Sequence, residues 1–154
     1  MIDLGTAALA AQALNNAVSA VDRFYGLYKA SRNEAVEGSV LRANPKAEAL
    51  EYIGPGGDRR EVMTYLQLSE KLNKDDLSLI RAFERRMEAA VAQWEALQGD
   101  LPLASPVERA KIEANLRRMQ EEDICYCLKK IIDYIEGLDI DLYDHYRHVR
   151  YICN

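Results

Sequence analysis

The sequence predicts an all-α fold, an antiparallel bundle of four to five helices that forms one domain over residues 1–154. Two observations predict it. A segment at about residues 106–137 has apolar residues at helical spacing between a helix start signal and a glycine. A second regular amphipathic segment, residues 76–98, precedes it after a short connection, which favours two antiparallel neighbours. Because 49% of the residues are apolar, the chain can bury a core around these helices.

The long segment begins with a capping box. Ser105 and Glu108 can each bond an amide at the helix start, and Pro106 between them has no amide to leave unbonded. Gly137 ends the segment, because glycine readily turns left-handed after a last helical turn. At about 1.5 Å per residue such a helix is about 48 Å long, so the other helices must lie alongside it. We therefore predict a bundle built around this helix, with a short terminal helix after it.

The apolar stripe of the long helix changes direction in the middle. A step of five separates Met119 from Ile124, whereas the other steps along the stripe are three or four. At about 100° per residue, this step swings the stripe roughly a third of a turn around the helix. We expect the first half to pack on residues 76–98 and the second half to form the centre of the bundle, against the N-terminal helix. The stripe consists of Ile112, Leu116, Met119, Ile124, Leu128, Ile131, Ile135 and Leu138.

The N-terminal segment has no charged residue from residue 4 to residue 21. This length is marginal for a membrane span, and its polar side chains would need partners that lipid does not offer. At helical spacing the polar side chains form one narrow stripe, and most of the remaining surface is alanine. We predict a helix over residues 3–31 that approaches its neighbours closely. The polar stripe consists of Gln12, Asn15, Asn16, Ser19, Asp22 and Arg23.

Residues 32–58 allow two interpretations. Asn44 and the proline after it favour a helix over residues 45–53, which ends at a breaker rich in glycine. The alternative is a hairpin that pairs residues 50–53 with residues 61–65 around that breaker. We prefer the helix, because no third strand-like segment is apparent and a two-stranded sheet is marginally stable.

Capping signals predict the remaining helices. Asp58 and Glu61 suggest a helix that starts there, and residues 73–76 break and recap the chain before the next one. After Gly137 the chain recaps at Asp139 or the aspartate two residues later, and the short terminal helix follows.

Charge and cysteine content limit the partners and the compartment. A net charge of −5 argues against nucleic acid as a partner, because phosphate binding needs clustered basic charge. Cys125 and Cys127 are two residues apart, so on a helix they point about 200° apart and cannot bridge each other. Three cysteines, an odd number, also do not form a disulfide framework. We therefore expect free thiols and a cytoplasmic protein, since the start has Asp3 and no basic signal segment.

The candidate metal ligands lie near the C-terminus. Asp141, His145 and His148 follow i, i+4, i+7 spacing and would share one helical face, where a carboxylate and two imidazoles can hold zinc. We prefer to interpret them as the polar face of a short helix, because the sequence has no second such set. Cys125 and Cys127 lie in the most apolar stretch, where burial makes a thiol inert, so we assign them to packing. No catalytic, cofactor-binding or metal site is predicted, and the protein is predicted not to be an enzyme.

Two functions remain. The first is a non-enzymatic interaction or oligomerisation module, because the apolar helical faces are numerous enough to bury a protein partner or a second copy. The second is a bundle that acts on membranes through its uncharged N-terminal helix. In residues 4–27, which include Leu14, Phe24 and Tyr25, the chain is similar to HeLo-type cell-death bundles, whose uncharged N-terminal helices are followed by aromatic residues. This resemblance implies a helix that can leave the bundle and enter a membrane.

Overall fold

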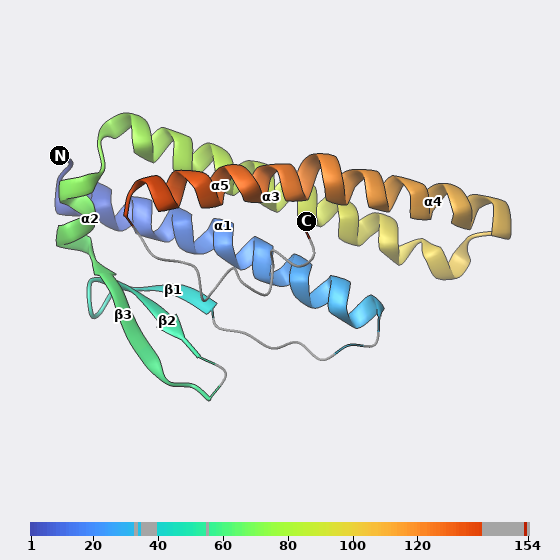
Figure 1. Ribbon diagram of the computed structural model, residues 1–154, viewed down its shortest axis with the longest axis horizontal. Coiled ribbons are helices and arrows are strands. Elements are labelled where there is room, and N and C mark those ends of the chain that lie inside the picture. The colour runs from blue at the N-terminus through green and yellow to red at the C-terminus, as the bar shows by residue number, and fades with distance from the viewer. Residues whose placement is uncertain (33, 35–39, 55, 140–152, 154) are drawn as a thin grey trace.

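The protein combines helices with a small antiparallel sheet (Figure 1). A computed structural model describes residues 1–32, 34, 40–54, 56–139 and 153. The all-α prediction is therefore wrong, since three strands lie between the first two helices. The elements in chain order are α1 (Leu4–Ser31), β1 (Val40–Asn44), β2 (Ala49–Ile53), β3 (Arg59–Thr64), α2 (Tyr65–Lys71), α3 (Lys74–Gly99), the 3₁₀ turn η1 (Leu101–Leu103), α4 (Pro106–Met119), the π-helix η2 (Gln120–Cys125) and α5 (Tyr126–Gly137).

Helix α1 has the bounds that the sequence predicts. Asp3 caps it, and its Oδ1 accepts a hydrogen bond of 2.7 Å from the amide of Thr6. Helix α1 lies against α3 and runs in the same direction, because the chain returns through the sheet and α2 before α3 begins (Figure 1). The amide of Ile2 donates to the carbonyl of Ser69 at 3.1 Å, which places the end of α2 beside the start of α1. The predicted antiparallel arrangement is therefore wrong for α1 and α3.

The sheet has the order β1-β2-β3 and contains the hairpin that was the less favoured alternative. The preferred helix over residues 45–53 is wrong. Strand β1, which the sequence did not reveal, supplies the third strand that makes the hairpin stable. Alternate residues of the sheet are buried, as expected for a sheet with one face on the core. The buried residues on that face are Leu41, Leu50, Tyr52 and Met63.

Two apparent helix caps belong to turns of this sheet. The Oδ1 atom of Asn44 accepts bonds from the amides of Lys46 and Ala47, at 3.2 and 3.3 Å, within the β1–β2 turn. Asp58 closes the β2–β3 turn through its carbonyl, which accepts from the amide of Gly54 at 2.8 Å. The helix predicted to start at Asp58 is wrong, because its cap is Thr64, six residues later.

Helices α4 and α5 and the π-helix between them form the long helix (Figure 1). The predicted capping box at Ser105 and the predicted end at Gly137 are both confirmed. The π-helix lies at the five-residue step from Met119 to Ile124, and a π turn brings residues five apart into line. Both side chains are buried, so the stripe continues on one side. The predicted swing of a third of a turn is therefore wrong, because the backbone absorbs the extra residue.

The long helix lies along α3 over its whole length, in the antiparallel orientation that the short connection predicts. Asn73 begins α3 with a capping box, as predicted. At the far end the Tyr134 hydroxyl donates to Asp76 Oδ1 at 2.5 Å, and the Tyr134 ring lies 5.9 Å from that of Phe83. Both halves of the long helix thus contact α3. The apolar side chains of α1, α3, α5 and the sheet join in one buried cluster.

Candidate interaction surface

The three candidate metal ligands, Asp141, His145 and His148, lie outside the described residues. Within residues 1–32, 34, 40–54, 56–139 and 153, no group of three or more His, Cys, Asp or Glu side chains could hold a metal ion. The predicted terminal helix also falls outside this part of the chain.

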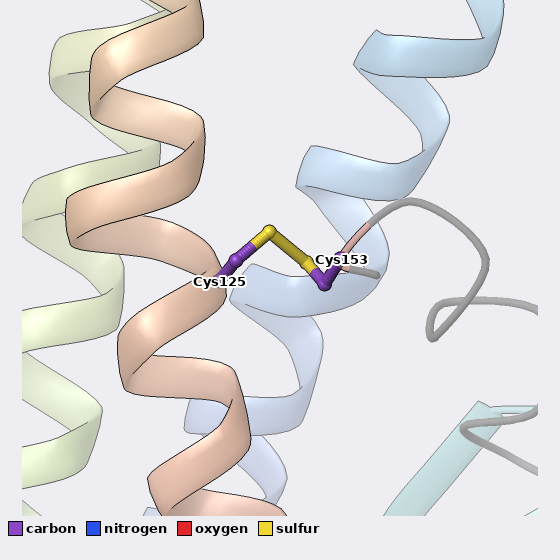
Figure 2. The surroundings of a disulfide bond; sticks show 2 residues. All are labelled: Cys125 and Cys153. Atoms are coloured by element: carbon purple, nitrogen blue, oxygen red, sulfur yellow. A yellow bond between two sulfur atoms is a disulfide. The ribbon is translucent and has the colours of Figure 1, made fainter.

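The cysteines differ from the expectation of three free thiols. Cys125 and Cys153 form a disulfide with their Cα atoms 5.2 Å apart (Figure 2). Helical geometry excluded a bond from Cys125 to Cys127, but it placed no limit on a partner 28 residues away. Cys127 is free and buried, and burial raises the pKa of its thiol, an effect that Arg86 partly offsets. The prediction that Cys127 serves packing is consistent with this burial.

The polar stripe of α1 forms hydrogen bonds and ion pairs with elements on both of its sides. On one side Asn16 Nδ2 donates to Glu84 Oε2 at 2.6 Å, and Arg23 forms an ion pair with Glu95, both on α3. On the other side Asn15 Oδ1 accepts from the amide of Ala43 on β1 at 2.7 Å. The stripe therefore fixes α1 between α3 and the edge of the sheet.

Asp22 belongs to this stripe and is the most perturbed carboxyl among the described residues. Its side chain is 15% exposed, and the Arg42 guanidinium on β1 lies 3.4 Å from Oδ2. Burial raises the pKa of Asp22 from 3.8 to about 7, although Arg42 acts in the opposite direction. The pKa of Asp22 is higher in the folded protein than in the unfolded chain. Asp22 therefore contributes stability that is complete below about pH 4 and is lost as the pH rises through about 7.

Replacing Asp22 with asparagine is expected to remove this pH dependence. We expect the variant to be more stable than the wild type at pH 8, by roughly 1–3 kcal/mol, and nearly equal to it at about pH 3.5, below the unfolded pKa of Asp22. Urea unfolding at the two pH values measures the difference, with the exposed Asp123→Asn as the matched control. An equal effect of Asp22→Asn at both pH values would contradict the assignment.

A groove runs between α1 and α3 beside these contacts. Its volume is about 390 Å³, and Ala20, Val91 and Ala92 form its apolar part. Its polar groups are engaged within the chain: Asn16 bonds to Glu84 and Arg23 pairs with Glu95. Ser19 bonds to the carbonyl of Asn15, so Glu88 is the one remaining polar residue of the lining, and it is exposed. We assign the groove no function.

The end of the α3–η1–α4 hairpin carries two of the three most exposed large apolar side chains among the described residues, the third being Met1 at the start of the chain. Leu103 in η1 is 90% exposed and Val107 in the first turn of α4 is 70% exposed. Figure 1 shows that this end of the hairpin extends beyond the last turn of α1. No other described element covers it. We call Leu103 and Val107, with the hollow beside them, the hairpin-end surface.

The hollow has a volume of about 450 Å³ and combines apolar and charged walls. Farther along α4, the exposed Ala110 and Ala114 continue from Val107 at helical spacing. At about 100° per residue they lie opposite the buried Leu116 and Met119, so α4 has a covered and an uncovered apolar face. The hollow is lined by Asp100, Leu103, Ala104, Glu108, Lys111 and Ile112.

Sequence reasoning missed this surface because it treated residues 100–104 as a connection. The signal was present in Leu103, an apolar residue in a short loop where polar residues are usual. Periodicity could not reveal it, because Leu103 lies outside both helices.

The membrane alternative requires α1 to leave the bundle. Among the described residues, no helix has both the length and the apolar character needed to cross a membrane. The apolar side of α1 is buried, including Leu14, Val18, Val21 and Phe24. Its release would expose the centre of the core, which argues against this alternative without testing it.

The chain matches no family model, no curated protein and no solved structure.

Proposed function

We propose that the protein is a non-enzymatic interaction module that binds a protein partner through its hairpin-end surface. The observation that carries this proposal is the exposure of Leu103 and Val107 at the end of a projecting hairpin. Large apolar side chains that cluster on a surface and adjoin a hollow are typical of protein interfaces. The capping box at Ser105 fixes the start of α4 between Leu103 and Val107, which gives this surface a defined shape.

The double variant Leu103→Ser/Val107→Ser tests the proposal. Surface substitutions of this kind change stability by about 0.5 kcal/mol or less, so the variant should fold normally. We expect it to lose the partner that purifies with the wild-type chain from the cells that produce it, with at least a tenfold lower yield of a complex of defined mass. Light scattering of the purified complex measures that mass and the ratio of its components.

Leu66→Ser is the matched control, since Leu66 on α2 is 58% exposed and lies outside the hairpin. A complex that survives Leu103→Ser/Val107→Ser but is lost with Leu66→Ser would contradict the proposed surface. Leakage of liposomes by the purified wild-type chain would support the membrane-acting alternative instead.

The disulfide provides an argument about the cellular compartment in which the protein functions. The expectation of a cytoplasmic protein was based on free thiols, and the bond between Cys125 and Cys153 removes that argument. Since disulfides persist in oxidising compartments, we propose that the chain reaches such a compartment. The number of reactive thiols in denatured protein from the producing cells should then be one, and three would contradict it.

A further inference from the structure

We draw no further inference here: the strongest candidate, the exposed apolar surface around Leu103 and Val107 at the end of the α3–η1–α4 hairpin, carries nothing beyond the proposed function, because nothing in the described part of the chain shows what covers it.

Discussion

Replacing Phe24 with alanine is expected to destabilise the protein by about 3–5 kcal/mol, in the upper range for a single truncation in a core. Phe24 is fully buried on α1, and its ring meets that of Trp94 on α3 edge-on at a centroid distance of 5.2 Å. The contact lies where α1 and α3 pack along each other, so its loss leaves a cavity between them. Because small domains are stable by about 5–15 kcal/mol, the variant should be close to unfolding at 37 °C.

Phe83→Ala is the matched control for this prediction. Phe83 is only half-buried on α3, next to Tyr134, and its truncation should cost about half as much or less. Urea unfolding followed by circular dichroism gives both values. A cost for Phe24→Ala no greater than that for Phe83→Ala would show that the α1–α3 contact is not the centre of the core.

Removal of the disulfide by Cys153→Ser is expected to cost about 3–4 kcal/mol. The bond closes a loop between residues 28 apart, and the chain-entropy relation for a loop of this length predicts that amount. The bond also connects the π-helix to Cys153, so the first turn of α5 should lose protection from hydrogen exchange in the variant.

The reductant dependence provides the control. Dithiothreitol should lower the stability of the wild type to that of Cys153→Ser and should leave Cys153→Ser unchanged. Cys127→Ala should keep its response to dithiothreitol, because Cys127 is outside the bond. A wild type and a Cys153→Ser variant of equal stability without reductant would contradict the bond.

The helices could be predicted from the sequence wherever local signals act alone. Asp3, Asn73 and Ser105 each accept a hydrogen bond from the amide three residues on, and Gly137 ends the long helix. These caps depend on neighbours within one turn, so reading the chain in order identifies them. The antiparallel pairing of α3 with the long helix follows for the same reason, because only a short connection separates them.

The sheet could not be predicted with the same means, since its strands are stabilised by partners elsewhere in the chain. Asparagine is common both in turns and at helix caps, so the residue type of Asn44 does not distinguish a turn from a cap. The pairing of β1 with β2, for example of Leu41 with Tyr52, identifies Asn44 as part of a turn. The disulfide is likewise a contact between distant residues. The five-residue step from Met119 to Ile124 is visible in the sequence, where it predicts a rotation of the apolar stripe. In the structure an extra residue in a π turn accounts for the step instead.

The predicted site and the observed surface differ for a related reason. A metal site is suggested by the residue types and the helical spacing of Asp141, His145 and His148. Leu103 has no reactive group and does not belong to a helical pattern of apolar residues. Its importance arises from exposure at the end of a hairpin, which only the fold reveals.

The most direct test of the interaction surface is photo-crosslinking in the cells that produce the protein. A benzophenone amino acid replaces Leu103 in one chain and Leu66 in another, and both positions are exposed. We predict one adduct of defined mass from position 103, which excess wild-type chain competes away and Leu103→Ser/Val107→Ser does not. An adduct twice the mass of the chain identifies a second copy. Equal adducts from both positions, or none from position 103, would contradict the account.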